Sequence, residues 1–165
     1  MTRFGNSNFF TVSFFGHRYI DDMIFVKQKL EDIIKGFIRV FYYVNFLVGR
    51  NGDFDQLVSS SIISPKKQTC SQNCCHIWLL PYQTSDLTAN QMYYNAYYDS
   101  IEVCPISAHA YYKQAINLRN RWMIDQSDAV ICYVKNRGGA FNAMKYAMKQ
   151  GKNVLNISDM LENHN

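Results

Sequence analysis

A turn with two adjacent glycines is the first part of this sequence whose residue types suggest chemistry. Gly138 and Gly139 follow an apolar run at 129–134, and a segment of helical character continues from Ala140. A helix N-terminus presents unpaired N–H groups and a partial positive charge, and glycine lets an anion come close. Residues 129–147 contain no Asp or Glu. We therefore interpret this segment as a phosphate-binding turn; the alternative is an ordinary turn and helix start.

A second candidate turn follows the apolar run at 9–15. Gly16, His17 and Arg18 stand directly after it. An imidazole and a guanidinium could both bind an anion here. Alternatively, His17 orients the turn through a hydrogen bond to the backbone, and Arg18 lies in solvent. The sequence leaves both interpretations open.

A third turn contains Gly49, Gly52 and Asp55, after the apolar run at 40–48. The glycines serve the backbone geometry of the turn. Asp55 could cap the helix that follows, or it could accept hydrogen bonds from ribose hydroxyls as an acidic residue does in dinucleotide-binding folds. If a glycosidic bond were cleaved, Asp55 would be the first candidate acid or nucleophile.

Three further side chains are candidates for the ligand site. Arg119 and Arg121 lie on the helix predicted before the run at 129–134, and residues two apart on a helix point in different directions. We expect at most one of them to face the site, and we favour Arg121. Tyr82 follows the strand predicted at 75–80 and could stack on a base, although packing explains an aromatic there equally well.

The elements that must position these residues alternate between strand and helix. This alternation predicts an α/β fold with a mainly parallel sheet and helices on both faces, and ligands of such sheets bind beyond the carboxyl ends of the strands. We expect polar loops at 64–73 and 83–98, the second with one short helix. The predicted strands are 9–15, 40–48, 75–80, 100–104, 129–134 and 153–157; the predicted helices are 21–37, 54–63, 108–126 and the segment after Gly139.

The composition limits the class of protein. The chain has 165 residues, of which 48% are hydrophobic and 18% charged, as expected for one globular domain over 1–165. The net charge is +4, but residues 111–152 hold eight Lys or Arg and only two Asp, which suits an anionic ligand. The basic residues lack an interleaved run of aromatics, so nucleic-acid binding is disfavoured.

No apolar run is long enough to span a bilayer and no signal peptide is evident, so we predict a cytoplasmic protein without a membrane partner.

The cysteines do not predict a metal site. A cytoplasmic protein keeps its thiols reduced. Cys70, Cys74, Cys75 and His76 lie close together, but a second spaced pair is lacking, so a zinc site is disfavoured and Cys75 and His76 are expected to begin a strand. We predict neither a metal nor a cofactor.

Four segments together resemble the SLOG superfamily, in the order and spacing of its small stand-alone bacterial branch. The resemblance covers nearly the whole chain. The segments are "VSFFGHR" at 12–18, "FLVGRNGDFDQLV" at 46–58, "LLPY" at 79–82 and "AINLRNRWMIDQSDAVICYVKNRGGAFNAMKYA" at 115–147. The resemblance implies a Rossmann-like fold, related to the lonely-guy phosphoribohydrolases and to the DNA-processing protein of transformation. It also implies a pocket for a nucleotide-derived ligand and, because many members pair, a homodimer.

The enzymes of that superfamily carry a "PGGxGTxxE" motif, from which this chain departs. Gly138 and Gly139 match its glycines, but Arg137 replaces the proline and Lys145 replaces the glutamate that works at the ribose. The departure argues against hydrolysis by that mechanism and leaves phosphate binding intact. We therefore predict binding of a nucleotide-like anionic ligand, for sensing or sequestration, by Gly16, His17, Arg18, Gly49, Gly52, Asp55, Tyr82, Arg121, Gly138, Gly139 and Ala140. The alternative is an enzyme that acts on the N-glycosidic bond of nucleoside monophosphates through Asp55.

Overall fold

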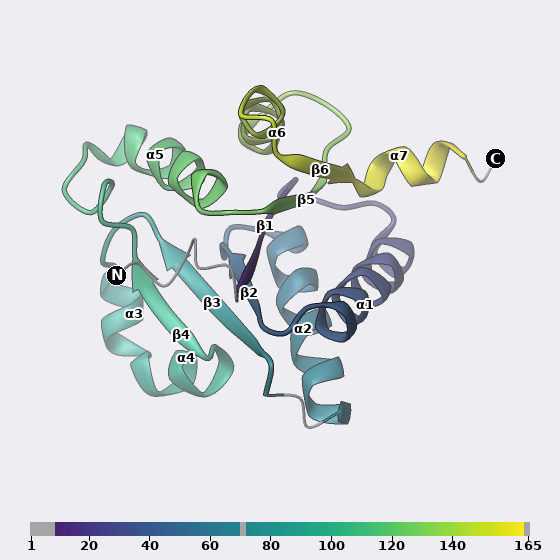
Figure 1. Ribbon diagram of the computed structural model, residues 1–165. Helices are drawn as coiled ribbons and strands as arrows, with labels where there is room; N and C mark the ends of the chain where they lie inside the picture. The colour runs from purple at the N-terminus through teal and green to yellow at the C-terminus, as the bar shows by residue number, and fades with distance from the viewer. Residues whose placement is uncertain (1–8, 70–71, 164–165) are drawn as a thin grey trace.

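Six parallel strands form one sheet at the centre of the fold (Figure 1). The computed structural model describes residues 9–69 and 72–163. The strand order is β4-β3-β2-β1-β5-β6, and every pairing is parallel. The predicted α/β class is thus confirmed, with a Rossmann-like sheet. The strands are β1 (Phe10–Gly16), β2 (Val44–Val48), β3 (Cys74–Leu80), β4 (Ser100–Val103), β5 (Ala129–Tyr133) and β6 (Asn153–Asn156).

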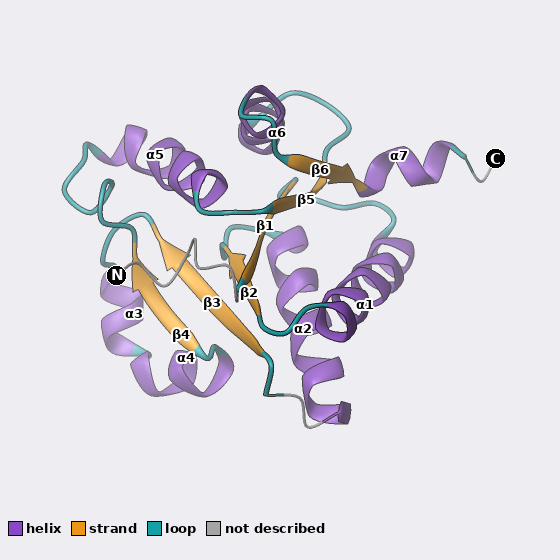
Figure 2. Cartoon of the chain, viewed as in Figure 1, coloured by secondary structure: helices purple, strands orange, loops and turns teal. Residues whose placement is uncertain are grey.

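Helices cover both faces of the sheet, as the alternation predicted (Figure 2). One face packs against α1, α2, α3, α4 and α7, and the other packs against α5 and α6. Because both faces are covered, the central strands are buried along nearly their whole length rather than at alternate residues. The helices are α1 (Met23–Val40), α2 (Asp53–Thr69), α3 (Ser85–Ala89), α4 (Gln91–Tyr97), α5 (Tyr112–Asp125), α6 (Gly139–Lys149) and α7 (Ile157–Glu162).

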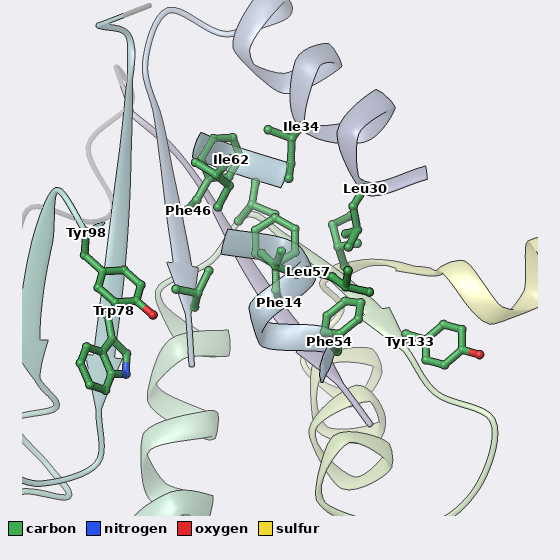
Figure 3. Close-up of a cluster of buried hydrophobic side chains, with 14 of the residues drawn as sticks. Phe14, Leu30, Ile34, Phe46, Phe54, Leu57, Ile62, Trp78, Tyr98 and Tyr133 are labelled. Carbon is green, nitrogen blue, oxygen red and sulfur yellow. The ribbon is translucent and has the colours of Figure 1, made fainter. Parts of the chain in front are cut away.

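Large side chains fill the layer between the sheet and the first group of helices (Figure 3). Phe14 of β1 and Phe46 of β2 meet Leu30 and Ile34 of α1, and all four are at most 1% exposed. Full burial of one such side chain contributes about 1.5–3 kcal/mol to folding. This packing fixes α1 and α2 against the strands whose ends carry the candidate site.

The strand order reverses at β1, which pairs with β2 on one side and with β5 on the other. The connections from β1 lead to one half of the sheet, and β5 begins the other half. At such a point the loops after neighbouring strands diverge and leave a crevice, which is where ligands of open α/β sheets bind. The loop that follows β1 contains His17 and Arg18, and the loop that follows β5 leads to Gly138 and Gly139.

The predicted loop at 64–73 is wrong over most of its length, because α2 continues to Thr69 and contains Pro65. Proline in a helix interior removes the N–H that would bond to the carbonyl four residues earlier, here that of Ser61. The helix nevertheless continues, since Ile62 and Pro65 are both buried. Tertiary burial therefore outweighs the local preference of proline and of the polar residues after it.

Other boundaries also differ from the predictions. The second strand starts at Val44 rather than 40, since α1 runs on to Val40 and bends follow. The segment at 83–98 holds two short helices instead of one, and α5 begins at Tyr112 instead of 108. The last strand ends at Asn156, whose side chain accepts a hydrogen bond from Ser158 N and so caps α7, a helix that was not predicted. In the described ranges no helix is both long and apolar enough to cross a membrane.

Candidate functional site

A cleft of about 290 Å³ lies at the carboxyl ends of β1 and β2, beside the start of α6. Its walls come from the β1–α1 turn, the β2–α2 turn, the inner side of α5 and the first residues of α6. It is lined by Phe14, Phe15, Gly16, His17, Arg18, Gly49, Asn51, Gly52, Asp55, Ile116, Arg119, Asn120, Met123, Gly138, Gly139 and Ala140.

The start of α6 presents backbone N–H groups at this cleft. Gly138, the N-cap residue, has φ 142° and ψ −169°, a conformation that side chains other than glycine rarely adopt. Its carbonyl accepts the first helical hydrogen bond, from Asn142 N at 3.0 Å. The N–H groups of Gly139 and Ala140 precede that bond and have no partner within the helix. They carry the positive end of the helix dipole and suit an anion.

A side chain at Gly139 would occupy the cleft without disturbing the fold. A Cβ built there meets no atom of the described residues within 4 Å, and Gly139 lines the cleft. The absent side chain therefore leaves space for a ligand rather than for another part of the protein.

Arg119 is the buried cation of the cleft. It is only 4% exposed, and its Nη1 donates a hydrogen bond to the Leu79 carbonyl at 2.8 Å. Its buried Nε has no hydrogen-bond partner among the described residues. Burial lowers the pKa of Arg119, which the neighbouring Asp55 partly offsets. A buried guanidinium with an unused donor is costly, so this side chain favours an anionic or hydrogen-bond-accepting ligand.

Asp55 stands beside Arg119 at the head of α2. Its Oδ2 accepts a hydrogen bond from Asn51 N at 2.8 Å, which fixes the β2–α2 turn. A Cβ at Gly49 would lie 2.9 Å from this Oδ2 and 3.1 Å from Arg119 Nη1, so only glycine lets the two groups approach the strand end. Burial raises the pKa of Asp55, while the Asn51 N–H and Arg119 act in the opposite direction.

His17 contacts the turn that precedes α6. Its Nε2 accepts hydrogen bonds from Lys135 N at 2.8 Å and from Asn136 N at 3.3 Å. Burial, and then the positive charge of Lys135, lower the pKa of His17, which suits this neutral acceptor. These bonds match the orienting role that the sequence left open. Arg18 is exposed at the rim of the cleft, where its carbonyl accepts a hydrogen bond from Asp53 N at 2.8 Å.

Nine of the predicted site residues line the cleft: Gly16, His17, Arg18, Gly49, Gly52, Asp55, Gly138, Gly139 and Ala140. The other two do not. Tyr82 is half-buried away from the cleft walls, and Arg121 lines an adjoining hollow between α5 and α6. The guanidinium carbon of Arg121 lies 5.4 Å from the centre of the Tyr146 ring.

The preference for Arg121 over Arg119 missed the residue that faces the cleft. Helical spacing held the signal, because Arg119 lies four residues from both Ala115 and Met123, and these two are fully buried. Arg119 therefore had to share the inner face of α5. Asn51 and Asn120 were also missed, since neither has a sequence pattern that marks it.

Within the described ranges no group of three or more His, Cys, Asp or Glu side chains is placed to hold a metal ion. Cys70 lies outside the described residues. Cys75 and His76 belong to β3, as predicted, and His76 Nε2 is hydrogen-bonded to Ser59 Oγ at 2.9 Å.

A scan against protein-family models gives no match, and a search of curated proteins gives no match either.

Proposed function

We propose that this protein binds a nucleotide-like anionic ligand in the cleft, as a sensor or a sequestering protein. Arg119 is the observation that carries the proposal: a nearly fully buried guanidinium in the cleft wall whose Nε has no partner among the described residues. The start of α6 supplies uncapped N–H groups at the same cleft, and Arg18 supplies a second cation at its rim.

The ligand would lie across the strand ends. Its phosphate would accept hydrogen bonds from the N–H groups of Gly139 and Ala140, with Arg119 or Arg18 as the charged partner. The rest of the ligand would extend toward Gly49 and Asp55, where a carboxyl group can accept hydrogen bonds from hydroxyl or amino groups. A charge-assisted hydrogen bond of this kind contributes about 1.5–3 kcal/mol.

Calorimetric titration with a panel of nucleoside 5′-monophosphates tests the proposal. We expect Gly139→Val to weaken binding at least about tenfold, because the new side chain fills the phosphate position. Gly36→Val is the matched control: it places the same side chain on α1, where a Cβ also meets nothing within 4 Å, and it should bind like the wild type. If Gly139→Val binds as tightly as the wild type, the ligand does not bind at this turn.

Arg119 and Arg18 are tested in the same titrations. Arg119→Gln and Arg18→Ala should each weaken binding, and circular dichroism should show that Arg119→Gln still folds. If both variants keep full affinity while Gly139→Val loses it, the turn stands and the charged partner lies elsewhere.

A second candidate function is cleavage of an N-glycosidic bond, and the environment of Asp55 favours it. Its carboxyl group lies in the cleft, and burial raises its pKa. Such a group could donate a proton to a departing base, or attack the sugar carbon once ionised. Since Lys145 replaces the glutamate of the related enzymes, we expect no rapid release of base from nucleoside monophosphates. Fast release, detected by chromatography and lost in Asp55→Asn, would instead establish the enzyme.

We also propose that the chain is a cytoplasmic bacterial member of the SLOG superfamily. The strand order, with its reversal at β1, and the position of the motif turns around one cleft support this membership. Both the location and the membership stay predictions.

A further inference from the structure

The hollow that holds Arg121 adjoins the cleft. It measures about 280 Å³ and is lined by residues of α5 and α6. These two helices contact each other on the same face of the sheet; Figure 1 shows where they lie in the fold. Asn120 of α5 and Gly139 of α6 line both cavities. A ligand bound at the start of α6 could therefore extend past these two residues into the hollow.

The charged side chains that line the hollow are both positive. Arg121 comes from α5 and Lys145 from α6, and no Asp or Glu is among the described lining residues. Asp125, one turn beyond Arg121, accepts a hydrogen bond from the Tyr146 hydroxyl at 2.9 Å and does not line the hollow. Amides of Asn117 and Asn142 add hydrogen-bond donors. This set of groups suits a second anion.

Asn120 marks the junction between the two cavities. Its Oδ1 is buried and has no hydrogen-bond partner in the part of the chain that the structure describes. An unsatisfied acceptor of this kind calls for a donor from a ligand. A sugar hydroxyl, placed between two anionic groups, would supply it.

The helix sets the distance between the two anion positions. Asn142 and Lys145 lie three and six residues along α6 from Gly139, which is roughly 5–9 Å at about 1.5 Å per residue. Two phosphoryl groups on different carbons of one sugar can span such a distance. Adjacent phosphates of a diphosphate chain lie closer together.

We propose that the ligand is a nucleoside bisphosphate: one phosphate binds at the start of α6, and a second, on another carbon of the sugar, binds between Arg121 and Lys145. This inference rests on the proposed function, because it requires the first phosphate to bind at Gly139 and Ala140. It adds the class of ligand and a second subsite that the cleft alone does not contain.

Calorimetric titration with adenosine 5′-monophosphate and adenosine 3′,5′-bisphosphate tests the inference, and the two guanosine equivalents repeat it with another base. We expect the bisphosphate to bind at least about tenfold more tightly than the monophosphate to the wild type. The double variant Arg121→Ala/Lys145→Ala should lose this advantage and keep its monophosphate affinity. The control Lys113→Ala/Lys149→Ala removes two exposed cations from the same helices, outside the hollow, and should keep the advantage.

The outcomes separate the two proposals. If the monophosphate binds and the bisphosphate binds no more tightly, the second subsite is wrong and the proposed function stands. An advantage that both double variants lose equally reflects general charge attraction, and it also overturns the subsite. If neither a monophosphate nor a bisphosphate binds, the second subsite fails together with the proposed function.

Discussion

Gly16 lies against the Phe54 ring so closely that a methyl group has no room there. A Cβ at Gly16 would be 2.1 Å from Phe54 Cγ, and Phe54 is fully buried at the start of α2. Gly52 has the same constraint, since its Cβ would lie 2.5 Å from the Arg18 Cα. These two glycines bring the β1–α1 turn and the β2–α2 turn together, and so they shape one wall of the cleft.

The Gly16 contact makes a prediction about stability. Gly16→Ala should lower the free energy of unfolding by about 1–3 kcal/mol, because the ring cannot move without disturbing the core. Gly36→Ala, in the interior of α1 with open space around it, should raise it by about 0.5–1 kcal/mol. Chemical denaturation of both variants measures the difference. A Gly16→Ala variant as stable as the wild type would mean that this contact is not tight.

The cleft depends on the pairing of β1 with β5. Asp128, just before β5, bonds twice to Thr11: Asp128 N donates to the Thr11 carbonyl at 2.8 Å, and Asp128 Oδ2 accepts from Thr11 N at 2.8 Å. Thr11 is fully buried. The carboxylate of Asp128 thus fixes the register that brings the end of β1 beside the end of β5.

Removal of the Asp128 carboxylate should lower the stability of the fold. Asp128→Ala leaves the Thr11 N–H without its acceptor, so we expect the free energy of unfolding to fall by about 1–3 kcal/mol. Asp125→Ala, which removes an exposed hydrogen bond to Tyr146, should cost less than about 1 kcal/mol. Equal losses in urea denaturation would show that the Thr11 bond contributes no more than a surface contact.

Buried tyrosines hold the short helix α4 in place. Tyr94 and Tyr98, in and after α4, are buried, and the Arg50 guanidinium lies 5.0 Å from the Tyr94 ring centre and donates to the Tyr98 hydroxyl at 3.1 Å. Part of the tyrosine-rich segment therefore fixes α4 against the β2–α2 turn instead of facing solvent.

The stability of the whole molecule should depend on pH through His76. Its imidazole is 2% exposed, and burial is the main cause that lowers its pKa from 6.5 to about 4. The unfolded chain takes up this proton below pH 6.5, whereas the folded protein takes it up only near pH 4. The stability that neutral, buried His76 contributes is therefore fully present above pH 6.5 and is lost as the pH falls to about 4. Over this range the free energy of unfolding should fall by roughly 3 kcal/mol.

Unfolding free energies measured between pH 7 and pH 4 check this expectation. His76→Gln should lose less stability over that range than the wild type, and His109→Gln, an exposed control, should follow the wild type. The raised pKa of Asp55 acts in the opposite sense, but it is common to all three proteins. Identical pH profiles for His76→Gln and the wild type would contradict the assignment.

A homodimer is the remaining prediction for the whole molecule. The resemblance implies it, and apolar side chains remain exposed on several elements, among them Tyr42, Met92 and Ile24. Light scattering at working concentration should give twice the mass of the 19.3 kDa chain. A clean monomer mass would remove this prediction.

The sequence by itself determined the class of fold and the turns that surround the cleft. Alternating apolar runs and helical segments identified all six strands, because strands buried on both faces of a sheet consist mainly of apolar residues. The glycines at 16, 49, 52, 138 and 139 were identified as site residues because they lie at the end of a strand or in the turn after it, and parallel strands all end at the same edge of the sheet.

Only the tertiary structure decided which long side chains face the cleft and where helices end. Arg119, and not Arg121, lines the cleft because α5 buries the face that carries Ala115 and Met123, a rotation that depends on packing with the rest of the fold. Helix α2 passed through Pro65 because burial there outweighs a lost backbone bond. Local sequence patterns determine which secondary structure each segment prefers. The direction in which a side chain points and the residue at which a helix ends depend on contacts between segments that are far apart in the chain.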